Sequence, residues 1–355
     1  MSELRALVAA ARQLREAQRP FLSASVLAVR GSGYRHTGAR MITTDEEWLA
    51  GSISGGCLER DVVTKGFWHT RSARARLMTY DQTSDALEGI VSSGCQGIID
   101  VLLERHDPGQ LDEADVFAAA ERCVRDEQRA VIVTVIRSSR ADVAVGARLI
   151  WQGGRWYVAS AHAALRELFA DAAYKAYAQQ LGAHTVERAQ LEVLVEPLWP
   201  PIHLYVFGTG HDAAPLVGMA QQLGWNVSVW DASPRSSARQ KFQAADHYLT
   251  GSIDDAVVRA ATAARAAAVV MGHHFPRDRA AVEALIASSV PYVGILGARQ
   301  RIELLLEGMP SQPQRVYAPV GLRLGAQTPA EISLAILAQI QSVLAQPASS
   351  HARLL

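Results

Sequence analysis

The stretch HLYVFGTGHDAA, residues 203–214, decides the fold of the C-terminal half of the chain. Its first five residues predict a strand, Gly208 and Gly210 follow in the pattern G-x-G-x-x-A, and a helix opens behind them. Glycines at these positions allow a tight turn and a close approach of the backbone to a phosphate, to which the helix N-terminus offers its amides. Asp231 ends the next predicted strand, where an acidic residue accepts a ribose hydroxyl in dinucleotide-binding domains. The stretch therefore predicts a Rossmann-like domain.

Downstream of this stretch, strand and helix patterns alternate as far as a final helix, which we expect to begin at the capping box Thr328-Pro329-Ala330-Glu331. Such alternation predicts a doubly wound parallel sheet. The carboxyl ends of its strands meet in one crevice, so we expect His211 and His273 to lie near the glycine loop. A nicotinamide dinucleotide, another nucleotide, a pterin phosphate or an empty crevice all fit this pattern, and helix capping is the alternative for the histidines.

The proline-rich segment EPLWPP, residues 196–201, marks the domain boundary, because such a segment is not expected to continue a helix or a central strand. We predict an N-terminal α+β domain over residues 1–196, an extended linker over residues 197–201 and the Rossmann-like domain over residues 202–355. The predicted fold class is therefore α/β, with a Rossmann-like doubly wound parallel sheet in the C-terminal domain and an α+β domain, which carries the Gly-Gly-Cys loop, in front of it.

The N-terminal domain contains a short internal repeat. Residues 38–42, GARMI, are followed by Trp48, and residues 146–150, GARLI, are followed by Trp156 at the same spacing. Matching apolar strands, VLAVR and VTVIR, precede the two copies, and we interpret the pattern as a duplication. Only the first copy continues into a Gly-Gly-Cys loop, so the repeated scaffold does not require those residues. The chemistry of this domain is therefore expected in the first copy.

The Gly-Gly-Cys loop lies within GSISGGCLE, residues 51–59. Gly55 and Gly56 let the backbone bend sharply before a predicted helix, and Cys57 stands at its N-terminus, where a thiol pKa is lowered. A soft thiolate suits a soft metal centre, which makes Cys57 the candidate metal ligand, with Glu59 able to orient the loop. Cys95, in SGCQG, is a second candidate, and a packing role is open for both cysteines.

Two further features of this domain have alternative interpretations. Arg35, His36 and Arg40 stand beside glycines in GSGYRHTGAR, residues 31–40, and predict an anion-binding loop or, alternatively, a solvated hairpin tip. Cys123 lies in an Ala-rich helix and is expected to be core filling.

Composition excludes several classes of protein. Lys and Arg number 35 and so do Asp and Glu, which gives a net charge of +0 and argues against a protein that coats nucleic acid. The three cysteines show neither zinc nor iron–sulfur spacing, and disulfides are not expected, which favours a reducing, cytoplasmic location. The sequence predicts neither a signal peptide nor a membrane span.

These stretches resemble the XdhC/CoxI family. In the N-terminal half the resemblance rests on GSGYRHTGARM and GSISGGCLE, and in the C-terminal half on the GTGH loop, VVMGHHFPRD, YVGILGARQR and VYAPVGLRLGAQTPAEISLAIL. It covers nearly the whole chain. The loops depart from the family at GCQG in place of GCGG, at YRHTG in place of PRxPG, and at GHHFPRD in place of THDHxxD, which leaves the ligand of the pocket open.

The resemblance implies a chaperone without turnover of its own. Such a protein binds the molybdenum cofactor, supports its sulfuration by a cysteine desulfurase and delivers it to a xanthine dehydrogenase-type molybdenum hydroxylase, as a homodimer. The residues assigned to cofactor binding, with Cys57 also assigned to the metal, are Cys57, Gly55, Gly56, Cys95, Arg40, Gly208, Gly210, His211, Asp231 and His273. The alternative, an NAD(P)-dependent oxidoreductase, rests on the Rossmann pattern alone and is not favoured. A docking scaffold would explain neither loop.

Overall fold

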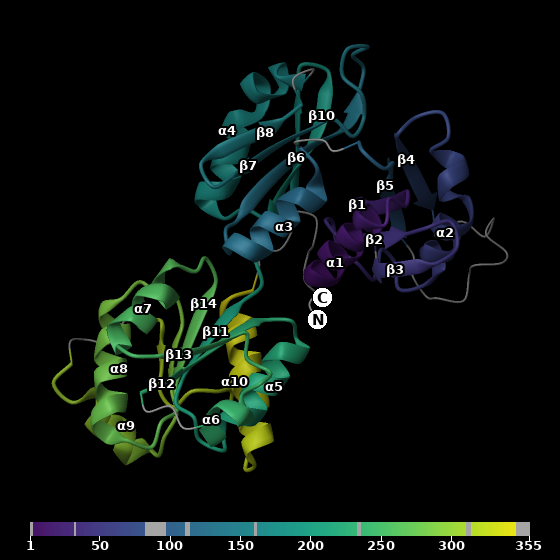
Figure 1. The fold of residues 1–355 in the computed structure, drawn as a ribbon. Coiled ribbons are helices and arrows are strands. Elements are labelled where there is room, and N and C mark those ends of the chain that lie inside the picture. Colours follow the sequence, from purple (N-terminus) through teal and green to yellow (C-terminus); the bar gives the residue numbers. More distant parts are fainter. Residues whose placement is uncertain are drawn as a thin grey trace. The chain divides into compact units, whose positions relative to one another are not determined.

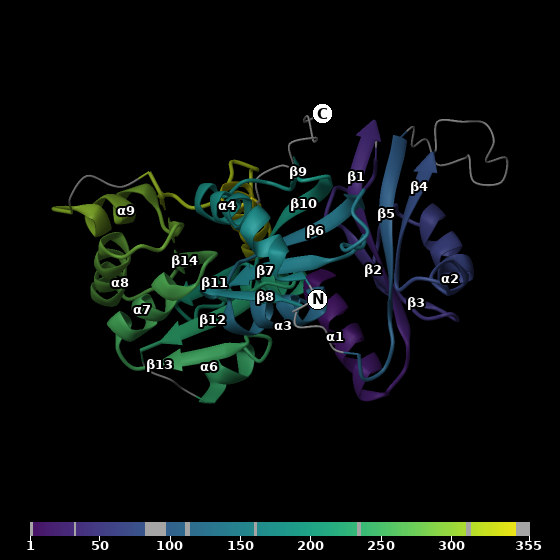
Figure 2. The same ribbon diagram turned by 90° about the horizontal axis from the view of Figure 1, so that it is seen from above.

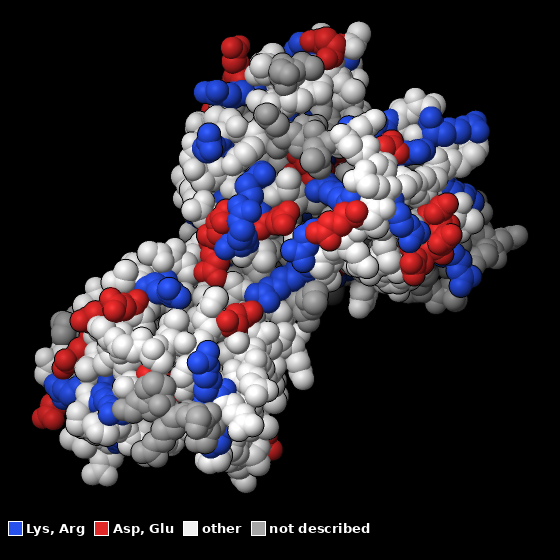
Figure 3. Space-filling view, viewed as in Figure 1, with Lys and Arg blue, Asp and Glu red and all other residues white. Residues whose placement is uncertain are grey.

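The computed structural model describes residues 3–31, 33–81, 97–110, 114–159, 162–232, 236–309 and 314–345. The chain divides into two compact units, one ending at Trp199 and the other beginning at Pro200 (Figure 1). None of the described helices is long and apolar enough to cross a bilayer. On the face drawn in Figure 3, basic and acidic side chains are interspersed, so this face presents no broad basic surface of the kind that nucleic acid requires.

The N-terminal unit consists of two copies of one arrangement. The first copy comprises α1 (Glu3–Glu16), β1 (Phe21–Gly31), β2 (Arg40–Thr43), β3 (Trp48–Gly51), α2 (Cys57–His69), β4 (Ala75–Asp81) and β5 (Gly97–His106). The second comprises α3 (Val116–Asp126), β6 (Ala130–Ser138), β7 (Arg148–Gln152), β8 (Arg155–Val158), α4 (Ala164–Gln179), β9 (His184–Arg188) and β10 (Leu191–Leu198). The sheets have the orders β3-β2-β1-β5-β4 and β8-β7-β6-β10-β9. This matching topology confirms the predicted duplication.

Each copy buries one helix against its own sheet. Leu58 and Val62 of α2 pack on the first sheet, which lies along the helix in Figure 2, and Phe169 of α4 packs on the second. A third cluster joins the copies, because α1 and α3 pack together through Leu7, Phe117 and neighbouring apolar residues. The two copies therefore share a core.

The predicted linker, residues 197–201, begins too early in the chain, because its first two residues belong to a strand. Strand β10 continues through Pro197 to Leu198, which pair with Val131 and Ala130 of β6. The other neighbour, β9, pairs with β10 only as far as Val195, so beyond that residue β10 has a partner on one side alone. Proline lacks an N–H and is tolerated where a strand has an open side, which explains its place at the end of this central strand.

The C-terminal unit is the Rossmann fold that the sequence predicts. Its elements are β11 (His203–Phe207), α5 (Ala213–Gln222), β12 (Asn226–Asp231), α6 (Ser236–Lys241), β13 (His247–Thr250), α7 (Ile253–Thr262), β14 (Ala266–Val270), α8 (Phe275–Ala287), β15 (Val293–Ile295), α9 (Arg299–Leu306), β16 (Val316–Tyr317) and α10 (Pro329–Val343). The six strands are parallel, in the order β13-β12-β11-β14-β15-β16. Separate apolar clusters cover the two faces, with α5 and α10 on one and α7, α8 and α9 on the other (Figure 1). The order reverses between β11 and β14, and in sheets of this kind ligands bind outside the carboxyl ends of the strands at such a reversal.

Candidate functional site

Glu59 organises the Gly-Gly-Cys loop. Its Oε1 accepts hydrogen bonds from the backbone N–H groups of Ile53, Ser54 and Gly55 at 2.8, 2.8 and 3.1 Å. Its Oε2 accepts from the N–H of Gly56 at 2.8 Å and from the hydroxyl of Ser54 at 2.5 Å. Four consecutive amides therefore converge on one buried carboxylate, and the orienting role expected of Glu59 is what the structure shows.

These contacts fix the charge of Glu59. Burial by itself raises the pKa of a carboxyl, but the hydrogen bonds from Ser54 and the loop amides outweigh burial and lower the pKa of Glu59 to about 2. The carboxylate is thus ionised at neutral pH. Because the loop amides point at Glu59, they are not available to cradle a phosphate. The loop is a rigid support for the start of α2, and Cys57 is the first residue of that helix.

Both glycines of the loop have backbone angles that other residues rarely adopt. The φ angle is 98° at Gly55 and 131° at Gly56, so the expected sharp bend is present. A Cβ atom at Gly55 would lie 3.0 Å from the ring of Tyr34, whereas Gly56 has open space around that position. The loop is therefore covered on one side at Gly55 and open at Gly56.

A hollow of about 350 Å³ adjoins the open side of this loop. Glu46 and Glu47 of the β2–β3 turn and Trp48, the first residue of β3, form one wall, and Arg60, Val63 and Thr64 of α2 form the other, with Gly56 and Glu59 between them. This hollow was not predicted from the sequence. The residue that could have indicated it is Trp48, which the sequence analysis uses only to show the equal spacing of the two repeat copies.

The two arginines of the predicted anion-binding loop, Arg35 and Arg40, form ion pairs with glutamates of the protein. The guanidinium of Arg40 is buried and bound to Glu196 of the second copy. Arg35 pairs with Glu3, whose carboxylate also accepts a hydrogen bond from the N–H of Ser52 at 3.1 Å. Both arginines therefore hold structural contacts in this loop. Whether Arg40 also binds a ligand stays a prediction.

The structure describes the three cysteines to different extents. Cys123 of α3 is fully buried in the core shared by the two copies, as expected. Cys95 falls within residues 82–96, outside the described part of the chain, and for Cys57 the structure describes the backbone only. Among the described residues, no group of three or more His, Cys, Asp or Glu side chains is arranged to hold a metal ion.

A second cavity, of about 120 Å³, lies where the two copies meet. Arg30 and Arg137, the last residues of VLAVR and VTVIR, both reach the carboxylate of Asp100, at 3.1 and 3.8 Å. Arg137 also donates to Glu192 at 2.8 Å. Two cations face two carboxylates here, so the charges of this cavity are balanced within the protein.

In the Rossmann unit, Gly208 and Gly210 hold the backbone turn at the end of β11. Gly208 has a φ of 134°, and a Cβ there would lie 2.8 Å from the backbone nitrogen of Gly272. A Cβ at Gly210 would lie 2.3 Å from Oδ1 of Asp212 and 2.7 Å from Nε2 of His273. These two side-chain atoms are 3.5 Å apart. The structure therefore brings His273 to the glycine loop, and Asp212 with it.

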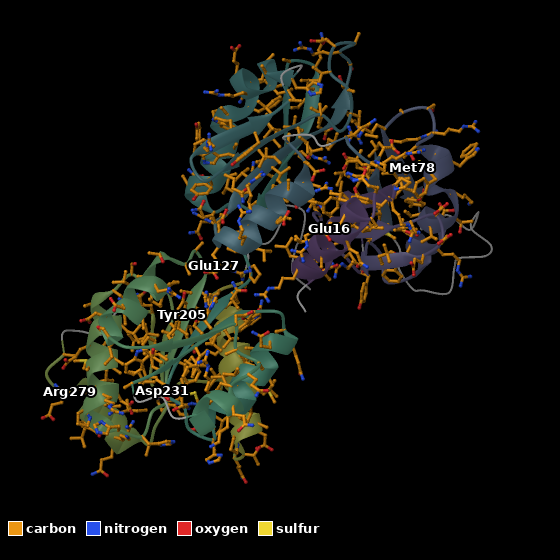
Figure 4. All side chains as sticks on the ribbon, viewed as in Figure 1. Glu16, Met78, Glu127, Tyr205, Asp231 and Arg279 are labelled. Atoms are coloured by element: carbon orange, nitrogen blue, oxygen red, sulfur yellow. The ribbon has the colours of Figure 1, made fainter. Side chains whose placement is uncertain are left out.

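The other side chains predicted for this crevice are placed differently. His211 contacts Lys241 at 3.3 Å, and Asp231, at the end of β12 (Figure 4), accepts a hydrogen bond from the hydroxyl of Tyr248 at 2.6 Å. His274 caps α8, so only one of the two adjacent histidines faces the loop. Asp212 was not predicted from the sequence, and neither was Arg301, which binds the buried Asp278 at 2.6 Å.

Comparisons with known proteins agree with this architecture. The XdhC Rossmann domain matches residues 204–340, and the XdhC and CoxI family matches residues 14–81. A Bacillus subtilis (strain 168) protein, named as a probable xanthine dehydrogenase subunit, is 28% identical over 334 residues, 92% of this chain and 94% of that protein. The uncharacterized protein YqeB of Escherichia coli K12 is 28% identical over 146 residues, 39% of this chain and 27% of that protein. A solved structure described as a xanthine dehydrogenase from Bacillus halodurans aligns with a TM-score of 0.72 at 26% identity, covering 97% of this chain and 96% of that one.

The two units define a class of protein in which a duplicated α+β domain carries a clamped Gly-Gly-Cys loop and a Rossmann domain follows it. The matched stretches fall in both units and together span more than half of the chain. This chain belongs to the XdhC and CoxI family, as the resemblance of its motifs predicted.

Proposed function

We propose that this protein is a maturation factor for a xanthine dehydrogenase-type molybdenum hydroxylase, and that it binds the molybdenum cofactor as cargo. Family membership supports the maturation role, since relatives that match more than nine tenths of the chain carry xanthine dehydrogenase names. In this proposal the protein performs no turnover. It holds the cofactor during sulfuration by a cysteine desulfurase and then passes it to the apoenzyme.

The observation that carries the cofactor proposal is the clamp of Glu59 on the Gly-Gly-Cys loop. Four backbone amides and one hydroxyl hydrogen-bond to Glu59 and fix the loop. Directly after this loop comes Cys57, the first residue of α2. Helix N-termini favour the thiolate form of cysteine, and a thiolate is a soft ligand suited to a sulfur-bound metal. The second copy of the repeat has neither the glycines nor the cysteine. This difference between the two copies supports a single binding site, at the loop of the first copy.

The test is retention of the cofactor by the full-length protein. Purified protein is incubated with molybdenum cofactor, freed of excess and oxidised, and the bound pterin is measured by fluorescence. Wild type should retain about one pterin per chain, and Cys57→Ala should lose it. Cys123→Ala, which changes a buried cysteine of the same unit, should retain it. Stoichiometric pterin in Cys57→Ala would overturn the assignment of Cys57 as metal ligand.

Binding of NAD⁺ and NADP⁺ is measured alongside. Dinucleotide binding without pterin binding would favour the oxidoreductase alternative over the maturation factor. Retained cofactor should in addition restore activity to a cofactor-free xanthine dehydrogenase, and a protein that binds pterin but never transfers it would contradict the delivery step.

A further inference from the structure

The hollow beside the Gly-Gly-Cys loop contains an aromatic face that the protein does not cover. Trp48 is 46% exposed, and its indole N–H already donates to the carbonyl of Gly51 at 2.6 Å. The polar edge of the ring is thus satisfied within the protein. No other ring of the described residues contacts it. What remains open is a fixed apolar surface that lines the hollow.

The second copy of the repeat fills the corresponding space with its own side chains. Trp156, the equivalent of Trp48, lies 5.0 Å from the ring of Trp151 and 5.3 Å from that of Tyr174, to whose hydroxyl it donates a hydrogen bond. In the first copy Thr43 stands at the position of Trp151 in the repeat, and the residues of α2 that line the hollow are not aromatic. The scaffold therefore accommodates stacked rings at this place, and only the first copy leaves it vacant.

Two charged side chains lie on opposite walls of the hollow. Glu47 is on the β2–β3 turn and Arg60 is on α2, and both are exposed. Neither has an ion-pair partner among the described residues. The neighbouring Glu46 differs, because it pairs with Arg19 at 3.4 Å. The hollow thus offers a carboxylate that can accept hydrogen bonds and a guanidinium that can donate them.

We infer that this hollow binds a planar 2-amino-4-oxopyrimidine ring, the pterin of the cofactor. The ring stacks on Trp48, its adjacent amino and ring N–H groups donate to the carboxylate of Glu47, and Arg60 meets its oxygen-bearing or anionic side. Aromatic stacking of this kind is tolerant of the exact ring and is strengthened by such polar contacts. The cavity of about 350 Å³ lies within the usual range of small-molecule sites, about 300–1,000 Å³. Because Gly56 lines the hollow and Cys57 follows it, the ring lies beside the proposed metal ligand.

This inference rests on the proposed function for the identity of the ring, so the experiment uses a probe that lacks the metal. Pterin-6-carboxylate is titrated into the full-length protein, and its fluorescence is followed. Wild type should bind and quench it. Trp48→Ala should weaken binding about tenfold, Trp48→Phe much less, and Glu47→Gln severalfold, in line with the energy of ring stacking. Cys57→Ala should bind the probe like wild type.

Trp68→Ala is the matched control, because Trp68 is an exposed tryptophan of α2 that does not line the hollow. Equal affinities for Trp48→Ala and Trp68→Ala, or no binding by wild type, would overturn the inference. Glu47→Gln guards against misfolding of the tryptophan variants, since the change is isosteric and falls on an exposed side chain. Guanosine monophosphate shares the ring edge of pterin. Weaker binding of that nucleotide supports the pterin assignment, and binding of the nucleotide alone overturns it.

The same variants separate this inference from the proposed function. If the complete cofactor is bound in a manner that depends on Cys57 but not on Trp48 or Glu47, the proposed function stands and the ring site falls. If pterin-6-carboxylate binds through Trp48 while the complete cofactor is not retained, the ring site stands and the proposed function falls.

Discussion

Arg40, on β2 of the first copy, donates two hydrogen bonds to Glu196, on β10 of the second, from Nη1 to Oε1 at 2.7 Å and from Nη2 to Oε2 at 2.6 Å. The duplication repeats this contact in reverse, because Arg148 on β7 of the second copy binds Glu104 on β5 of the first. All four side chains are buried. The Gly-Ala-Arg motif of each copy therefore serves to hold the other copy.

Removing one partner of such a pair should destabilise the N-terminal unit. Arg40→Ala leaves the carboxylate of Glu196 buried without its cation, which typically costs about 3–5 kcal/mol. Arg148→Ala should behave alike, and the exposed Arg60→Ala should change unfolding by less than about 0.5 kcal/mol. Urea unfolding measures all three. Loss of cofactor in Arg40→Ala with unchanged stability would instead support the sequence-based assignment of Arg40 to the binding site.

Glu59 should make stability depend on pH in acid. Its pKa is lowered from 4.5 to about 2 in the folded protein, so its contribution is complete above pH 4.5 and is lost as the pH falls towards 2. That shift corresponds to roughly 3 kcal/mol. Glu59→Gln should therefore be less stable than wild type at pH 7, and the difference should shrink by pH 3.

Urea unfolding at a series of pH values checks this expectation, with the exposed Glu46→Gln as the control. A difference between Glu59→Gln and wild type that is the same at pH 7 and pH 3 would show that the side chain acts through its shape and not through its charge.

His106 should add a second pH dependence at higher pH. The imidazole is stacked on Phe21 at 4.5 Å and lies 5.4 Å from Phe117, and burial lowers its pKa from 6.5 to about 4 against the opposing effect of Asp115. Protonation thus favours the unfolded chain, and stability present above pH 6.5 is lost as the pH falls to 4, by about 3 kcal/mol.

His106→Gln should remove most of that loss, whereas His36→Gln, which changes an exposed histidine, should leave it in place. Unfolding measured between pH 7 and pH 4 distinguishes the two variants. An undiminished loss of stability in His106→Gln would assign the effect to other groups.

The Rossmann half could be predicted almost element by element, because its strands are short buried apolar runs separated by helices with clear signals. The bounds of β11 and the capping box at Thr328 both match. Strand β4 gives a weaker signal, because none of its residues is fully buried and its sequence lacks the apolar run of the central strands. The pairing of Arg40 with Glu196 could not be predicted, since it depends on the register of strands 156 residues apart.

Only those parts of the candidate site that depend on local sequence could be predicted. Glycines that need positive φ and a carboxylate three residues into a helix are local signals, so Gly55, Gly56 and Glu59 could be identified from the sequence. The hollow depends on what the first copy lacks, and it becomes visible only when Trp48 and Trp156 are compared in three dimensions. Asp212 lies within the glycine pattern of the sequence, and only the fold shows that its carboxylate lies against Gly210.

That placement leads to a prediction about dinucleotides. A pyrophosphate approaches the second glycine of a Rossmann loop, yet here Oδ1 of Asp212 lies against Gly210, with Nε2 of His273 beside it. A like charge about 4 Å away costs about 1 kcal/mol even in water, which is roughly fivefold in affinity. We therefore expect weak binding of NAD⁺ by wild type and binding at least about fivefold tighter by Asp212→Asn.

Asp255→Asn provides the control, because it makes the same change of net charge at an exposed position of α7. Isothermal titration with NAD⁺ and NADP⁺ at low and high salt measures the effect, and the gain in Asp212→Asn should diminish as salt screens the charge. Tight binding by wild type that Asp212→Asn leaves unchanged would mean that the carboxylate moves aside when the dinucleotide arrives. In that event the glycine loop of this unit would be a working nucleotide site, and the Rossmann unit would have a ligand of its own besides the cofactor proposed for the Gly-Gly-Cys loop.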